Sequence, residues 1–119
     1  MDTIDPQHDA TLRPHLDAIQ ASMRAGFRFR HLPGFDNVLA VQGFRVACGA
    51  MDVYLARAPD DSLAARFRID DLEFGSPPAL WHRHGAVADV VTALLELPAH
   101  GTPGAPNMAR SPATDLWVP

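Results

Sequence analysis

The clearest alternation of hydrophobic and polar positions in this chain lies within the stretch from Asp52 to Asp71. Leu63, Phe67 and Ile69 alternate with small and basic side chains, the period of two of a strand with one buried and one exposed face. Residues 59–62, Pro-Asp-Asp-Ser, are typical of a turn, because proline presets φ and short polar side chains bond to nearby backbone groups. The pattern therefore predicts a β-hairpin.

The length of that turn decides which side chains of the first strand share the apolar face of the second. A loop of three residues would place Val53 and Leu55 on that face, whereas a loop of two or four would place Asp52 and Tyr54 there. In the second case Asp52 would be a buried carboxylate, suited to act as a general base. We expect the first case, because it buries more aliphatic surface and leaves the two polar residues beside Arg66.

Apolar positions at helical spacing predict an amphipathic helix from Asp9 or Thr11 to Ala25. Pro14 then falls in the first turn, where a missing N–H costs little, and Gly26 is suited to end the helix in a left-handed conformation. The stripe that we expect to face the core consists of Leu12, Leu16, Ile19 and Met23.

A second amphipathic helix is predicted from Ala86 to Leu97, and Pro98 ends it. Asp89, Thr92 and Glu96 form its polar face. The opposite face is aliphatic and consists of Val87, Val90, Val91, Leu94 and Leu95.

Two further segments are rich in strand-forming residues. Residues 27–30 alternate briefly and are typical of an edge strand. Residues 38–48 predict either one strand with a kink or bulge near Gly43 or two short strands that turn there. Residues 71–84 contain glycine and two prolines, so we expect an irregular segment across the sheet edge.

Together these elements predict a single α+β domain over residues 9–97, with a loose lead-in at 1–8 and an extended, proline-rich tail at 98–119. The expected sheet is an antiparallel meander of three or four strands, with both helices on one face. The other face would carry Tyr54, Arg66, Arg68 and Arg45, which suits a surface for self-association or for a partner.

The end of the tail carries an apolar group that is costly to leave in water. Leu116 and Trp117 stand next to Val118, so this segment should find a groove on the domain or on a partner protein. Trp81 is a second large apolar group in a segment without a predicted element, and we treat it as a candidate for the same contact.

Composition narrows the classes of function. The net charge is −4 and no basic run is present, which disfavours nucleic acid and anionic membranes as partners, and no apolar run is long enough to span a bilayer. All ten basic residues are arginine, which is typical of a high-GC bacterial genome. Cys48 is the single cysteine and lies among apolar residues, so we expect a buried thiol and a cytoplasmic protein.

The densest group of reactive side chains is Trp81-His82-Arg83-His84. In an extended segment, His82 and His84 would project to one face and could share acid–base work. A metal site needs a further ligand that no spacing supplies, and the phosphate-loop, nucleophile-elbow and zinc-knuckle motifs are all missing, so we expect no cofactor.

The function that we expect is that of a non-catalytic cytosolic interaction protein, such as an accessory, chaperone-like or immunity-type partner, which also self-associates as a homodimer. Its contacts would come from Trp117, Leu116, Trp81, Arg66 and Arg68. The alternative is a small cofactor-free isomerase or cyclase with a small-molecule substrate, in which His82 or His84 acts as general acid–base and Asp52 or Tyr54 assists.

Overall fold

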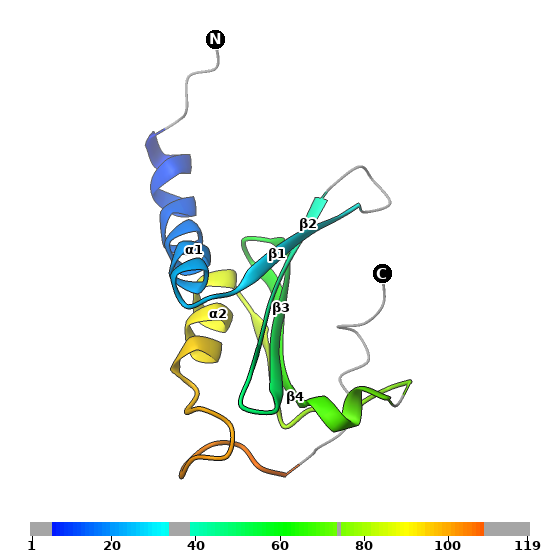
Figure 1. The fold of residues 1–119 in the computed structure, drawn as a ribbon. Helices are drawn as coiled ribbons and strands as arrows, with labels where there is room; N and C mark the ends of the chain where they lie inside the picture. Colours follow the sequence, from blue (N-terminus) through cyan, green and yellow to red (C-terminus); the bar gives the residue numbers. More distant parts are fainter. Residues whose placement is uncertain (1–5, 34–38, 74, 109–119) are drawn as a thin grey trace.

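The computed structural model describes residues 6–33, 39–73 and 75–108 (Figure 1). Within these residues the chain forms two α-helices, a short 3₁₀ helix and a five-stranded antiparallel sheet in the order β1-β2-β3-β4-β5. The elements are α1 (Pro6–Arg24), β1 (Arg28–Pro33), β2 (Leu39–Ala47), β3 (Ala50–Ala58), β4 (Asp61–Arg68), η1 (Ile69–Glu73), β5 (Trp81–Gly85) and α2 (Val87–Glu96).

The predicted α+β meander is confirmed, but the strand count of three or four was too low. The missed strand is β5, which lies in the stretch expected to be irregular and pairs with β4 over Trp81–Gly85. Its sequence, Trp-His-Arg-His-Gly, contains no β-branched residue, so its composition does not predict a strand. Of the stretch expected at 38–48, the described part forms a single strand, Leu39–Ala47, which pairs with β3 without a shift of register at Gly43.

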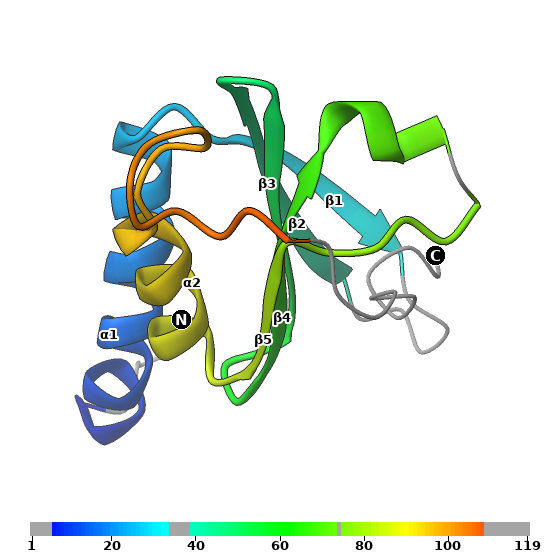
Figure 2. The ribbon, with the colours of Figure 1, turned by 90° about the horizontal axis from the view of Figure 1, so that it is seen from below.

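Both helices lie on one face of the sheet, as expected, but they cover the face that carries Tyr54 (Figure 2). The opposite face is more aliphatic and is built on Val53, Leu55, Ala65 and Phe67. In Figure 2 it is η1 and the segment after it that lie on this side. The expectation that Tyr54 and its arginine neighbours lie on an open face was therefore wrong.

The β3–β4 hairpin reaches the expected phase by an unexpected route. Ala58 pairs with Asp61, so the turn has two residues, but the register shifts between Ala56 and Ala58. This β-bulge adds one residue to β3, and the pairs beyond it have the phase of a three-residue loop. Val53 accordingly shares the face of Phe67.

The β2–β3 hairpin turns at Cys48 and Gly49, whose φ angles are 55° and 82°. Two central residues with positive φ are typical of the type I′ turn, whose twist matches that of the flanking strands. Cys48 is consequently exposed, which corrects the expectation of a buried thiol. Apolar neighbours in the sequence do not bury a side chain that stands at the tip of a turn.

Helix α1 ends as the sequence predicts. Gly26 has a φ of 95° and donates to the carbonyl of Met23, while the N–H of Phe27 donates to the carbonyl of Ser22. These two bonds form a Schellman motif, which satisfies carbonyls that the helix end would leave free. Phe27 is then buried against the sheet.

The start and the buried face of α1 differ from the prediction. The helix begins at Pro6, so Pro14 lies in its interior and not in its first turn. Leu16 and Met23 of the expected apolar stripe are 47% and 56% exposed, whereas Ala18 and Ser22 are buried. Both buried side chains are small, so they weigh little in a pattern of large apolar residues, and α1 packs mainly against α2.

Helix α2 confirms its prediction in both bounds and buried face, since Val87, Val90, Val91 and Leu94 are buried. Its first residue follows Ala86, which has the extended backbone of an N-cap but no side chain to accept a hydrogen bond. His15 of α1 supplies the acceptor: its Nδ1 atom lies 3.1 Å from the backbone nitrogen of Ala88, which donates to it. A side chain of one helix thus caps the other.

Candidate binding site at the β5 edge

The polar residues of the predicted hairpin form an ion pair beneath the helices. Asp52 and Arg66 lie opposite each other on β3 and β4. Arg66 donates from Nε to Oδ1 of Asp52 at 2.6 Å and from Nη2 to Oδ2 at 3.0 Å. Asp52 is 4% exposed and Arg66 is 3% exposed, so this is a buried two-point contact of the strong, charge-assisted kind.

Further contacts of this pair reach the ends of both helices. Arg66 also donates from Nη1 to the carbonyl of Pro98 at 2.6 Å, just beyond α2. Arg45 lies 3.4 Å from the Asp52 carboxylate and donates to the carbonyl of Ala25, just beyond α1, at 2.8 Å. Because the Asp52 carboxylate is already bound by two guanidinium groups, it is poorly placed to accept a proton from a substrate.

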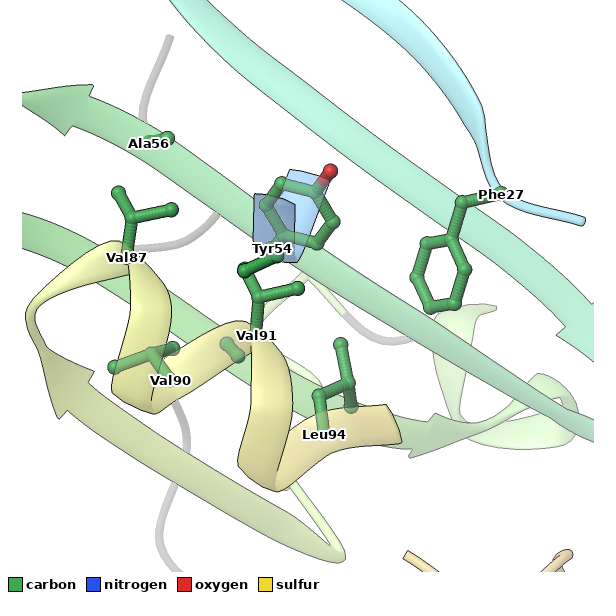
Figure 3. Close-up of a cluster of buried hydrophobic side chains, with 9 residues drawn as sticks. Phe27, Tyr54, Ala56, Val87, Val90, Val91 and Leu94 are labelled. Carbon is green, nitrogen blue, oxygen red and sulfur yellow. The ribbon is translucent and has the colours of Figure 1, made fainter. Parts of the chain in front are cut away.

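Tyr54 lies at the centre of the helix-side core, in contact with Phe27 and with the aliphatic face of α2 (Figure 3). Its side chain is 0% exposed, and its hydroxyl lies 2.8 Å from the hydroxyl of Ser22 on α1. Burial raises the pKa of Tyr54 to about 12, and the hydrogen bond with Ser22 lowers it by less. A phenol in this setting holds a helix to the sheet and does not exchange protons near neutral pH.

The structure does not bring the four candidate catalytic residues together. Asp52 and Tyr54 belong to the sheet face beneath the helices, whereas His82 and His84 pair with the residues of β4 that face the other way. Both histidines are exposed. The described part of the chain also holds no group of three or more histidine, cysteine or acidic side chains that could bind a metal ion.

The most accessible functional side chains lie on β5, which is an edge strand in the described sheet. His82, Arg83 and His84 are all exposed. His84 lies 3.4 Å from Asp61, and both side chains are largely in solvent. Arg83 forms no ion pair within the part of the chain that the structure describes.

A pocket opens at the beginning of this strand. It has a volume of about 530 Å³ and is lined by Leu80, Trp81, His82, Gly104 and Pro106. Trp81 is half-buried, and its inner side packs against the helix-side core. The pocket therefore joins an aromatic side chain to the free edge of a strand, an arrangement that suits an extended segment with an apolar anchor.

The remaining predicted contact residues fall in three different places. Arg68 lies at the end of β4, where its Nη1 atom is 3.6 Å from Asp71 and its Nη2 atom donates to the carbonyl of Asn107 at 2.5 Å. Arg66 is buried in the ion pair, so it is not available to a partner. Leu116 and Trp117 lie outside the described residues.

Sequence reasoning missed Arg83 as a site residue, and it missed Gly104 and Pro106 as parts of a pocket wall. In the sequence Arg83 belongs to no motif of its own, because the cluster is defined by the two histidines beside it. It becomes a candidate binding residue only through its position on an edge strand. The two tail residues have no pattern of their own. They line the pocket because the first part of the tail is held to the sheet at Pro98 and Asn107.

Comparisons with protein-family models, with curated proteins and with solved structures found no match to this chain. None of the helices in the described residues combines the length and the apolar character needed to cross a membrane. The geometry of the chain itself therefore carries the assignment of a function.

Proposed function

We propose that this protein is a non-catalytic interaction protein of the bacterial cytoplasm, which binds an extended segment of a partner protein along β5. The observation that carries the proposal is the combination of an edge strand, an Arg83 that forms no ion pair among the described residues, and a pocket beside Trp81. Strand addition uses the free backbone groups of an edge for affinity and side-chain pockets for specificity.

The buried polar groups support a binding role over a catalytic one. Asp52 is held by Arg66 and Arg45, and Tyr54 is held by Ser22, so each makes contacts that stabilise the fold. His82 and His84 lie across the sheet from both. The isomerase or cyclase alternative needs these groups in one pocket, so we do not pursue it.

Charge indicates the kind of partner. The opposite sheet edge, β1, also exposes cations, namely Arg28 and Arg30. Direct pairing of two β5 edges would bring like charges close together, which disfavours that form of homodimer. An acidic segment fits better, since it would meet Arg83 along with the edge.

Affinity capture from a lysate of the native host, followed by measurement of binding with the purified captured protein, tests the proposal. We expect Arg83→Glu to weaken this binding at least tenfold. The matched control is Arg24→Glu, which reverses an exposed charge on α1 and should leave binding unchanged. Equal binding by both variants, or no specific capture by the unmodified chain together with a monomeric sedimentation profile, would overturn the proposal.

A further inference from the structure

Strand β2 continues past the beginning of its outer neighbour, β1 (Figure 1). β1 begins at Arg28, opposite Phe44, so within the described residues the last three residues of β2 have a neighbouring strand only on the β3 side. Next to the two-residue turn, Ala47 and Ala50 exchange backbone hydrogen bonds, and the bonding direction then alternates along the strand. The N–H and C=O groups of Val46 therefore point away from β3, at an open strand edge.

A pocket of about 340 Å³ opens at this edge. It is lined by Gly26, Arg28, Phe44, Arg45 and Val46. The side chain of Val46 is 60% exposed. The pocket thus brings together an unpaired stretch of backbone, an exposed aliphatic side chain and two guanidinium groups.

The charge at this pocket is not balanced by the residues around it. The Asp52 carboxylate makes its two short bonds, of 2.6 and 3.0 Å, to Arg66. Arg45 lies 3.4 Å from the same carboxylate, and its Nε atom is buried without a hydrogen-bond partner. The ring of Phe27 attracts Arg45 without cancelling its charge. Arg28 adds a second cation, which is exposed and forms no ion pair within the part of the chain that the structure describes.

We propose that this pocket binds the C-terminal end of an extended peptide from a partner protein, with the terminal carboxylate between Arg28 and Arg45. The direction of the strands carries the assignment. A peptide that pairs antiparallel with the end of β2 lies in line with β1 and points its C-terminus at the first residue of β1. It must stop there, because the chain that enters β1 from α1 occupies the next position.

The last residue of such a peptide falls opposite Val46. Its N–H group would donate to the carbonyl of Val46, and its carboxylate would accept charge-assisted hydrogen bonds from the two arginines. Its side chain would lie on the face of Val46 and Phe44, so an aliphatic residue fits best. β1 and β5 are opposite edges of the sheet, so this site is separate from the one on β5 and does not depend on the proposed function.

Titration of the full chain with acetyl-Gly-Thr-Val-Val, followed by the backbone amide signals in NMR spectra, tests the inference. We expect the signals of Val46 and of its neighbours in β1 and β2 to shift. The same peptide with a C-terminal amide in place of the carboxylate should bind about tenfold more weakly, since it offers the arginines no charge. Equal affinities of the two peptides would overturn the proposal.

A pair of variants on β1 separates the pocket from general attraction between charges. Arg28→Gln should weaken binding of the free-acid peptide about fivefold or more. Arg30→Gln is the matched control, because Arg30 lies two positions further along the same strand, is exposed and does not line the pocket. Equal weakening by both variants, or by neither, would contradict a carboxylate held at Arg28.

Acetate and a methylated peptide distinguish a peptide end from an anion alone. Acetate carries the carboxylate without a strand, so it should shift the same signals only at a concentration about tenfold higher. A peptide methylated on the nitrogen of its last residue has no donor for the carbonyl of Val46 and should also bind weakly. Acetate or the methylated peptide binding as tightly as the unmodified peptide would show an anion site without strand pairing, and would overturn the inference.

Discussion

The ring of Tyr54 lies directly over Gly43, its cross-strand partner on β2. A Cβ atom at position 43 would stand 2.5 Å from the Cε2 and Cζ atoms of that ring. The glycine is therefore required by close approach of a buried aromatic group, and not by a bend or bulge in β2.

We predict that Gly43→Ala destabilises the protein by about 1–3 kcal/mol, because the added methyl group must displace a ring that is closed in by both helices. Gly75→Ala is the matched control, since nothing lies within 4 Å of its Cβ position. Chemical denaturation measures both. The double variant with Tyr54→Leu should lose less than the sum of the single changes, and strict additivity would show that the ring is not the obstacle.

We predict that Asp52→Asn lowers the free energy of unfolding by about 3–5 kcal/mol, because it leaves the buried guanidinium of Arg66 without its counter-charge. Asp61→Asn provides the contrast. Asp61 pairs with Arg57 at 3.7 Å, and both side chains are more than 40% exposed, so its loss should cost less than about 1 kcal/mol. Similar losses for the two variants in urea denaturation would contradict the role given to burial.

The shifted pKa of Tyr54 predicts a loss of stability in alkali. The neutral phenol is the form that the core accepts, so its contribution is complete below pH 10 and is lost as the pH rises towards about 12. A shift from 10.0 to about 12 corresponds to about 2–3 kcal/mol. Tyr54 is the single tyrosine, so the absorbance of its phenolate can be followed directly.

Tyr54→Phe is the variant that checks this assignment. It should cost about 0.5–1.5 kcal/mol at neutral pH, because Ser22 keeps its bond to the carbonyl of Ile19. The decline of stability between pH 10 and 12 should become shallower by the amount assigned to the phenol. An unchanged slope would mean that other groups cause the alkaline loss.

The cap that His15 gives to α2 can be removed and replaced. We predict that His15→Ala costs about 1 kcal/mol, since the N–H of Ala88 loses its acceptor. Ala86→Ser in the same chain should recover most of that loss, because position 86 already has the backbone conformation of an N-cap. His31→Ala removes an exposed imidazole on β1 and should change thermal stability little. Failure of Ala86→Ser to compensate would contradict the capping role.

The parts of the fold that the sequence predicted are those fixed by local patterns. The alternation within β4, the bounds of α2 and the stop at Gly26 follow from strand period, helical spacing or a special backbone conformation. Each needs only neighbouring residues to be read.

The errors share a different cause, because each depends on contacts between distant segments. Which sheet face the helices cover was decided by partners for polar groups: Ser22 for Tyr54 and helix-end carbonyls for the arginines. The buried face of α1 is formed by small residues, Ala18 and Ser22, which an apolar pattern does not reveal. The site at β5 depends on a strand without strand-like composition, so it could not be recognised before the sheet was known.

The contacts of Asp52 have a consequence for motion. Through Arg45 and Arg66 this one carboxylate is connected to the backbone just beyond each helix. Separation of either C-terminal helix end from the sheet would break a hydrogen bond to the cluster of Asp52, Arg45 and Arg66. We therefore expect the helices and the middle of the sheet to unfold as one cooperative unit. The outer edge of β5 lies outside this unit, so a partner could bind or leave it without opening the ion cluster.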